Sequence, residues 1–307
     1  NYSFSYVAGT LTVNRANLTI TASDDRKVYG STTTVAGVTY VNGVATGATT
    51  GFTHSGLVNG DTLSTVTLTS LGGSATANVI DGPFTITPST AAGSTRTTTS
   101  NYNITYVPAT TGLSVTPLTL TLNSSTVTRA YDGTDALANM TLSTGVGSET
   151  IVLTNVSANS ANVTANGAPG NYIDAATITS GTGSASNYAL PTLNATNAPV
   201  AFTPKAISIA GVKTYDATTG FSGVQVTITG LIGSETLNFS GAASNDANVS
   251  TANKYFNALT LADGTNGGLA TNYALPSLTA ASANNTVTIN PLTLTLNSST
   301  VTRAYDG

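Results

Sequence analysis

Four tyrosine turns are the most regular candidates for chemistry in this sequence. They occupy Val28–Gly30, Tyr131–Gly133, Tyr215–Ala217 and Tyr305–Gly307, and three of them carry an aspartate that could bind calcium or act as a base. The turn also fits a strand exit, in which aspartate bonds the backbone two residues on and glycine supplies a positive φ. The tyrosine ring would then cover the end of a core, with its hydroxyl in water. Because the turn recurs, we interpret it as architecture.

Calcium is the metal that the aspartates could hold. It takes six to eight oxygen ligands, usually with several carboxylates. The best clusters are Asp24 with Asp25 and Asp132 with Asp135, and neither belongs to an EF-hand or a nonapeptide calcium pattern. We therefore predict no metal site and no cofactor, with calcium at these aspartates as the alternative.

Catalytic residue sets are poorly represented. His54 is the sole histidine and cysteine is absent, so a zinc site with several His or Cys ligands is excluded. Glu149 and Glu235 lie in two equivalent "GSET" segments, which we interpret as turns. A glycosidase needs two carboxyls in one cleft, whereas equivalent residues of successive repeats would lie a domain apart. The sequence thus predicts no catalytic residue, and we expect that the protein is not an enzyme.

Composition narrows the classes of partner. The chain has 307 residues with a net charge of −4, and only 7% of them are Asp, Glu, Lys or Arg, against roughly a quarter in ordinary domains. Its nine cations are scattered along the chain, with Arg26 and Lys27 as an adjacent pair, so the sequence predicts no basic surface for nucleic acid. No stretch approaches the ~20 apolar residues of a spanning helix, and we predict no membrane insertion. The lack of cysteine fits an extracellular protein that relies on packed strands.

Internal repeats organise the chain. The segment Pro117–Gly133 recurs unchanged as Pro291–Gly307, and Pro204 lies midway, 87 residues from each proline. An Asn-Tyr pair stands near the end of each repeat. We predict a closing strand of a preceding repeat, three full repeats, and an opening strand of a following repeat, at residues 1–16, 17–116, 117–203, 204–290 and 291–307.

Within each repeat the pattern is that of β-strands. Leu118–Leu122, Phe84–Pro88 and Val224–Gly230 alternate apolar residues with threonine at period two. Repeats of this length with several short strands favour an all-β fold of tandem immunoglobulin-like β-sandwiches, with a β-solenoid as the weaker alternative. The prolines leave almost no linker, so we expect the repeats to form an elongated, semi-rigid rod.

Particular motifs resemble known repeat families. Residues 17–115 are similar to the MBG repeat of large bacterial surface proteins, through "LTITASDDRKVYG", "GFTHSGLVNGDTLS", "FTITPS" and "NYNITYV". Residues 118–203 and 205–290 resemble the companion YDG repeat, with a departure at Ala217. The resemblance implies long, secreted bacterial filamentous adhesins, often of the two-partner-secretion type, located at the cell surface or outside the cell. It implies no catalytic residue.

Two roles follow from these patterns. The first is a structural stalk or filament segment of an adhesin, with neighbouring repeats and other copies in an extracellular fibre or biofilm as partners. The alternative is a direct glycan- or protein-binding module. We would place such a site at residues 88–100, which the first repeat has in excess, although their composition suggests a flexible loop. Residues 292–307 are expected to be ordered only where other sequence supplies their missing sheet.

Overall fold

The computed structural model of the protein describes residues 1–122, 127–164 and 170–307. The chain divides into two compact units. The first contains Asn1–Thr121, Ala138–Thr154 and Ala176–Thr192, and the second contains Leu122–Leu137, Asn155–Ala175 and Leu193–Gly307. Each unit therefore holds one complete sequence repeat together with part of residues 117–203. Residues 123–126 of the recurring segment lie outside the described residues, and the repeat boundaries stay a prediction.

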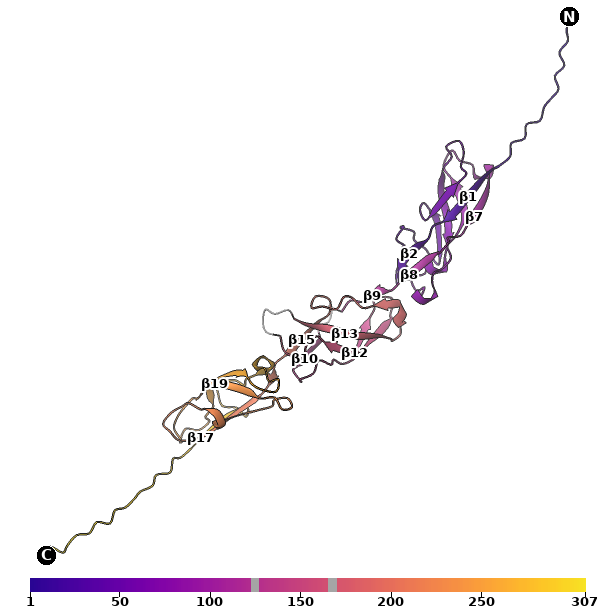
Figure 1. Cartoon of the computed structure of the whole chain (residues 1–307). Coiled ribbons are helices and arrows are strands. Elements are labelled where there is room, and N and C mark those ends of the chain that lie inside the picture. Colours follow the sequence, from indigo (N-terminus) through magenta and orange to yellow (C-terminus); the bar gives the residue numbers. More distant parts are fainter. Residues whose placement is uncertain (123–126, 165–169) are drawn as a thin grey trace. The chain divides into compact units, whose positions relative to one another are not determined.

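The first unit is built from short strands (Figure 1). Its elements are β1 (Ala16–Ala22), β2 (Asp25–Val28), β3 (Val44–Ala48), β4 (Phe52–Ser55), β5 (Leu63–Thr69), η1 (Leu71–Gly73), η2 (Val79–Asp81), β6 (Thr87–Gly93), η3 (Thr99–Asn101), β7 (Tyr102–Val107), β8 (Leu113–Thr116), β9 (Leu118–Thr119), β11 (Met140–Ser143), η4 (Ala185–Asn187) and β14 (Tyr188–Ala189), where η marks a 3₁₀ turn. Strand β1 pairs in parallel with β7 and antiparallel with β4, and β5 lies between β3 and β6.

Alternation in the sequence explains the core of this unit. In β1 the side chains of Leu18 and Ile20 are buried, while Thr19 and Thr21 are only partly covered. Val66 and Leu68 of β5 are buried in the same way and belong to the same apolar cluster. Because successive side chains of a strand point to opposite faces, each sheet contributes one apolar face to a shared core. Burying each of these side chains stabilises the fold by about 1.5–3 kcal/mol.

The segment 88–100 differs from the flexible loop suggested by its composition. Its first part lies in β6, which pairs antiparallel with β5. The amide of Ala91 donates to the Tyr106 hydroxyl at 2.8 Å, and the buried Thr97 hydroxyl accepts from the Thr62 amide at 2.9 Å. The expectation of a loop was wrong for residues 88–93, because they pair with β5 and the Tyr106 hydroxyl accepts the Ala91 amide.

The second unit repeats the same plan. Its elements are β10 (Val127–Ala130), β15 (Pro199–Thr203), β16 (Lys205–Ala206), β17 (Ser208–Thr214), η5 (Gly223–Gln225), β18 (Val226–Thr229), β19 (Leu237–Ser244), β20 (Phe256–Asp263), η6 (Ala270–Asn272), β21 (Tyr273–Ala274) and β22 (Asn285–Asn290). Strand β17 pairs in parallel with β22 and antiparallel with β18. Ile209, Phe221 and Phe256 form the centre of its core. Strands β12 (Thr150–Ala158) and β13 (Asn171–Ser180) each have residues in both units.

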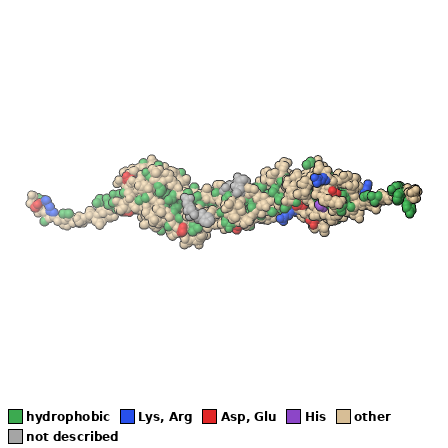
Figure 2. Space-filling model, turned by 90° about the horizontal axis from the view of Figure 1, so that it is seen from above, with side chains coloured by type: hydrophobic (Ala, Val, Ile, Leu, Met, Phe, Trp, Pro, Cys, Tyr) green, Lys and Arg blue, Asp and Glu red, His purple; other side chains and the backbone are tan. Residues whose placement is uncertain are grey.

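In its described residues, the protein is therefore all-β and of the sandwich type, as predicted. The β-solenoid, the alternative fold from the sequence, is not required to explain these strands. The elongated rod stays a prediction. Among the described residues, no helix has the length and apolar character needed to span a bilayer. Charged side chains appear as isolated spots on the face drawn in Figure 2, in keeping with their low number.

Two segments lie outside the sheets. Residues 1–15 and 291–307, which the sequence predicts as strands of neighbouring repeats, are exposed and form no strand in this structure. Leu294 and Leu296 are 82% and 95% exposed, whereas their sequence equivalents Leu120 and Leu122 are buried. The same residues thus adopt different environments according to what they can pair with.

Candidate functional site

A carboxylate bound to a tyrosine recurs in all three repeats. The tyrosine of each Asn-Tyr pair donates its hydroxyl to an acidic side chain that stands just before β5, β12 or β19. The pairs are Tyr102 with Asp61 at 2.6 Å, Tyr188 with Glu149 at 2.5 Å and Tyr273 with Glu235 at 2.7 Å. Each tyrosine directly follows a 3₁₀ turn, and this turn fixes the backbone position from which its side chain extends.

In the first unit, Glu149 accepts a second tyrosine. The Tyr29 hydroxyl donates to Oε1 of Glu149 at 2.8 Å, while Tyr188 occupies Oε2. The rings of Tyr29 and Tyr188 meet edge to face, with centroids 5.5 Å apart and planes at 78°, an arrangement that the ring quadrupoles favour. One carboxylate thereby joins the tyrosine turn of residues 17–116 to the end of residues 117–203.

In the second unit, the same arrangement is built from the next set of residues. Tyr131 donates to Oε1 of Glu235 at 2.6 Å, and Tyr273 donates to Oε2. The rings of Tyr131 and Tyr273 again meet edge to face, at 5.5 Å and 80°. We call each set of two tyrosines and one glutamate, with the asparagines described next, an inter-repeat joint.

A pair of asparagines completes each joint. In the first unit, Asn187 accepts a hydrogen bond from the Val79 amide at 2.9 Å and donates to the Asn78 side chain at 2.9 Å. In the second unit, Asn272 accepts from the Val163 amide and donates to the Asn162 side chain, each at 2.8 Å. Asn187 and Asn272 are 1% and 0% exposed. Their buried amide groups are satisfied only because the preceding repeat supplies partners.

The glycine of each turn faces a branched side chain. Gly30 and Gly133 have φ angles of +83° and +80°, which favour glycine. A Cβ atom on Gly30 would lie 2.7 Å from a methyl group of Val146, and one on Gly133 would lie 2.8 Å from a methyl group of Ile232. The joint therefore requires glycine for both backbone conformation and space.

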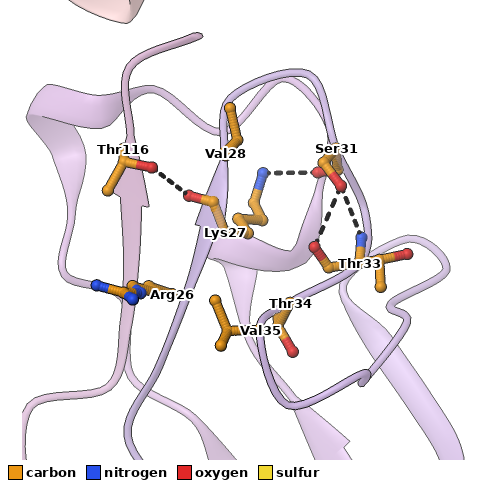
Figure 3. A pocket seen from close by; sticks show the side chains of 8 residues that line it. All are labelled: Arg26, Lys27, Val28, Ser31, Thr33, Thr34, Val35 and Thr116. Atoms are coloured by element: carbon orange, nitrogen blue, oxygen red, sulfur yellow. Dashed lines mark hydrogen bonds between the residues drawn. The ribbon is translucent and has the colours of Figure 1, made fainter.

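A cation lies two residues before the tyrosine of each turn, buried at Lys27 and Lys213 and partly exposed at Arg129. Lys27, Arg129 and Lys213 occupy this position. The Lys27 ammonium donates to the carbonyl oxygens of Ser31 and Ser74 at 2.9 and 2.8 Å, and Figure 3 shows it reaching toward Ser31 beside an open hollow of about 380 Å³. Burial lowers the pKa of Lys27. Its role is to hold the turn that carries Tyr29.

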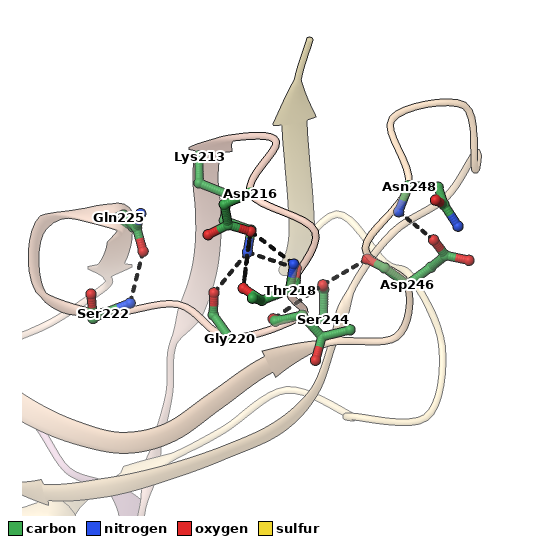
Figure 4. A network of polar contacts seen from close by, with 10 residues as sticks. Lys213, Asp216, Thr218, Gly220, Ser222, Gln225, Ser244, Asp246 and Asn248 are labelled. Atoms are coloured by element: carbon green, nitrogen blue, oxygen red, sulfur yellow. Dashed lines mark hydrogen bonds and ion pairs between the residues drawn. The ribbon is translucent and has the colours of Figure 1, made fainter. Parts of the chain in front are cut away.

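The other two cations hold their turns in the same manner. Lys213 donates to Asp216 and Thr218, each at 2.8 Å, and to the Gly220 carbonyl at 2.9 Å (Figure 4). The hydrogen bond from Lys213, followed by those from Thr218, lowers the pKa of Asp216 to about 2. Arg129 donates to Asp132 at 2.7 Å and also binds the carbonyl of Thr134.

The tyrosines of the joint are stabilised as neutral phenols. Burial, then the hydrogen bond to Glu235, raises the pKa of Tyr131, and raises that of Tyr273 to about 12. Burial and the bond to Glu149 raise the pKa of Tyr188 and of Tyr29. Each phenol is thus kept protonated, and it acts as a hydrogen-bond donor to the glutamate of its joint.

Two sequence interpretations of these residues need correction. The hydroxyl of Tyr131 was expected to be in water, but the residue is 4% exposed and the hydroxyl is bound to Glu235. The "GSET" segments do form turns, closed by amide bonds from Glu149 and Glu235 to the residues three before them. Their carboxylates, however, are joint residues that the sequence interpretation missed.

The aspartates considered for metal binding form hydrogen bonds with other groups of the protein. Asp24 accepts the amides of Thr111 and Gly112, each at 2.6 Å, and these bonds lower its pKa. Asp132 is bound to Arg129. In the part of the chain that the structure describes, no three His, Cys, Asp or Glu residues gather as a metal site. His54 is exposed on β4.

Residues at regular positions in the repeats of the sequence indicate the joint. A cation stands two residues before each tyrosine of the turns, and an acidic residue precedes each Asn-Tyr tyrosine by about 40 residues, with separations of 41, 39 and 38. "ANV" also recurs at 77–79, 161–163 and 247–249. Aligning these positions across repeats would have singled out the joint.

Comparison with known proteins supports one part of the resemblance. Residues 18–112 match the sequence model of the MBG domain, YGX type. The chain reads Tyr29-Gly30-Ser31 at its first turn, and this Tyr-Gly pair belongs to the joint. The predicted resemblance to an MBG repeat is thus confirmed for this segment, which is similar to domains of adhesin-like proteins. Neither a curated protein nor a solved structure gave a significant match to the chain.

Proposed function

We propose that this chain is a non-catalytic spacer segment of a bacterial surface or secreted adhesin. The MBG match at residues 18–112 supports the adhesin-like context. The spacer role rests on one observation, namely that two successive joints use the same chemistry. In each, a buried tyrosine of one repeat and the Asn-Tyr tyrosine of the next share one glutamate.

The strength of the joint fits this role. A hydrogen bond to a charged group contributes about 1.5–3 kcal/mol, and an edge-to-face ring pair adds about 0.5–1.5 kcal/mol. The asparagine pair adds two further bonds in a buried place. Contacts of this kind resist rotation about a junction that has almost no linker, so successive repeats would keep a defined spacing.

The proposal includes the absence of catalysis. Both carboxylate oxygens of Glu149, and both of Glu235, accept hydrogen bonds from tyrosine hydroxyls. A direct glycan- or protein-binding role is the alternative from the sequence. Its suggested segment begins with strand β6 and includes the buried Thr97, which leaves less of it free for a ligand.

Small-angle scattering of the full chain tests the spacer. A compact globule of 307 residues would have a radius of gyration of about 19 Å and an unfolded chain one of about 62 Å. We expect a value clearly above the first and below the second, with a scattering profile of defined rather than freely jointed repeats. A radius near that of the globule would contradict the proposal.

The joint can be tested in the same experiment. A variant with Tyr29→Phe and Tyr131→Phe removes one hydroxyl from each glutamate and should scatter as a more flexible chain with folded repeats. Tyr255→Phe is the matched control, because the Tyr255 hydroxyl makes no hydrogen bond within the described residues. Equal flexibility of the original chain and the double variant would show that the joints do not hold the spacing.

A further inference from the structure

Equivalent strands of the three repeats pair with different neighbours. Strand β18 of the third repeat pairs with β17, and β4 of the first repeat pairs in the same way with β1. In the middle repeat the equivalent strand is β11, which forms a hairpin with β12, the strand that follows it. Each of these strands ends six residues before the acidic residue that binds the Asn-Tyr tyrosine. One position in the repeat therefore has two kinds of sheet partner.

The place of one glycine separates the two arrangements. The residue directly after the strand is Gly56 in the first repeat and Gly230 in the third, with φ angles of +99° and +93°. In the middle repeat this residue is Thr144, and the positive φ falls one residue later, at +79° on Gly145. Because successive residues of a strand face opposite sides, a bend displaced by one residue turns the preceding strand toward a different neighbour.

The threonine also closes the hairpin of the middle repeat. The amide and the hydroxyl of Thr144 both donate to the Glu149 carbonyl at 3.1 Å. The Val146 amide in turn donates to the Thr144 hydroxyl at 3.2 Å. Gly230 has no side chain that could form these bonds. The residue at this position therefore supplies both the direction of the bend and the bonds that stabilise one of the two pairings.

In the third repeat, a hollow lies where the equivalent hairpin would form. Its volume is about 650 Å³, and Val226 of β18 and Phe239 of β19 both line it. The equivalent residues of the middle repeat, Met140 and Leu153, are directly paired. The segments that connect the two strands align without a gap in these repeats. Strand β18 is therefore long enough to take the same position beside β19.

The edge of β19 beside this hollow is open. Strand β19 pairs with β20 on one side, and on the other side a single bridge joins it to Gly220 within the described residues. The Phe221 amide still donates to the Ala242 carbonyl at 2.9 Å. The chain then leaves the edge through η5, where the Ser222 amide donates to the Gln225 side chain at 2.9 Å (Figure 4). Such an edge is a ready template for another strand.

Moving β18 to this edge would keep its apolar side chains covered. In β11, Met140 and Leu142 are partly buried and the residues after them are exposed. In β18, Val226 and Ile228 follow the same pattern. The same face of the strand thus turns inward in either arrangement, and each arrangement pairs four residues of the strand with its neighbour. The two pairings are therefore closely matched in burial and in backbone hydrogen bonds.

We propose that β18 is a movable strand that exchanges between β17 and β19, and that residue 230 selects its partner. Pairing with β17 leaves the hollow open, and pairing with β19 in the register of β11 closes it. Glycine adopts positive and negative φ about equally well, so Gly230 permits both states. A threonine there disfavours the positive φ and therefore favours the hairpin.

Engineered disulfides report the partner of β18, because the chain has no cysteine. Thr227→Cys with Ala210→Cys links a residue pair of the observed sheet. Thr227→Cys with Asn238→Cys links the pair expected in the hairpin, since a disulfide needs its two Cα atoms within about 7 Å. Under oxidation the first pair should close fast and the second more slowly, through the exchanged state. Transplanting the middle-repeat residues with Gly230→Thr and Leu231→Gly should speed closure of the second pair about tenfold.

The reverse transplant tests the selector independently in the middle repeat. Thr144→Gly with Gly145→Leu should slow closure of a disulfide between Thr141→Cys and Val152→Cys, which are paired in the hairpin. Leu231→Gly alone is the matched control for the third repeat, because it leaves residue 230 unchanged and should not alter the preference of β18. Urea unfolding of the reduced variants identifies any that do not fold.

Three outcomes would overturn the proposal. If the pair at positions 227 and 238 never closes in the folded protein, β18 does not exchange. If Leu231→Gly alone speeds closure as much as the double substitution, residue 230 is not the selector. If the reverse transplant leaves closure in the middle repeat unchanged, the threonine does not hold the hairpin. These rates do not depend on the spacing between repeats, which scattering measures separately.

Discussion

Tyr131 donates a hydrogen bond of 2.6 Å to Glu235, which lies 104 residues further along the chain. Tyr29 and Glu149, 120 residues apart, form the same bond at 2.8 Å. In both cases a tyrosine turn of one repeat reaches the acidic turn of the next. The contact is therefore a property of how repeats meet, and its consequences can be measured one residue at a time.

Removing the Tyr131 hydroxyl should destabilise the protein. Tyr131→Phe leaves Oε1 of Glu235 without its donor, and the loss of a hydrogen bond to a charged group costs about 1.5–3 kcal/mol. We expect a lower urea midpoint for the unfolding transition of the second unit. The control Tyr255→Phe, which removes no hydrogen bond among the described residues, should change the free energy of unfolding by less than about 0.5 kcal/mol. Equal shifts for both variants would contradict the joint.

Adding a methyl group at Gly30 should cost more than the same change at Gly37. Their φ angles are +83° and +79°, so alanine is strained at both, by about 1–2 kcal/mol. At Gly37 nothing lies within 4 Å of the new Cβ, whereas at Gly30 it meets Val146 at 2.7 Å. Overpacking adds about 1–3 kcal/mol. Thermal unfolding of Gly30→Ala and Gly37→Ala measures the difference, and equal losses would mean that Val146 does not pack there.

Stability should fall at alkaline pH. The folded-state pKa of Tyr273 is raised from 10.0 to about 12, because folding favours the neutral phenol. This stability is fully present below pH 10 and is lost as the pH rises through about 12. Urea unfolding between pH 9 and pH 12 should show the loss, and the Tyr273→Phe variant should lose less over the same window. Parallel curves would contradict the assignment.

Lys213 should be needed for the third tyrosine turn. Lys213→Met removes the buried charged donor to the Thr218 and Gly220 carbonyls, and the loss of a hydrogen bond to a charged group costs about 1.5–3 kcal/mol. Lys205→Met is the matched control, because the Lys205 ammonium binds no group within the described residues. Thermal unfolding should separate the two variants. A Lys213→Met protein as stable as the control would show that the network does not hold the turn.

The sequence predicted local structure better than contacts. The alternation in Val224–Gly230 correctly predicted strand β18, because period two needs no knowledge of the partner strand. Of Leu118–Leu122, in contrast, only Leu118–Thr119 form a strand, β9. Strand β6 was missed, since its Ser- and Thr-rich segment lacks that pattern and depends on pairing with β5.

Identical segments show why contacts are harder to predict. Residues 117–133 and 291–307 share every residue, yet Tyr131 is 4% exposed and Tyr305 is 94% exposed. The partners of Tyr131 are Glu235 and Tyr273, which lie more than 100 residues further along the chain, and no local property of the turn reports them. The cation that organises each turn, in contrast, stands two residues from its tyrosine and was open to recognition from spacing alone.

Each repeat contributes an acidic residue with an Asn-Tyr pair at one junction and a tyrosine turn with "ANV" at the other. Genetic recombination that removes or duplicates a whole repeat would therefore bring a matching set of residues together again. The copy number of the repeats could change in a single event, without compensating substitutions at the new junction. Changes at positions such as Ala217, which alter one side of that match, would then mark where an array is less free to be rearranged.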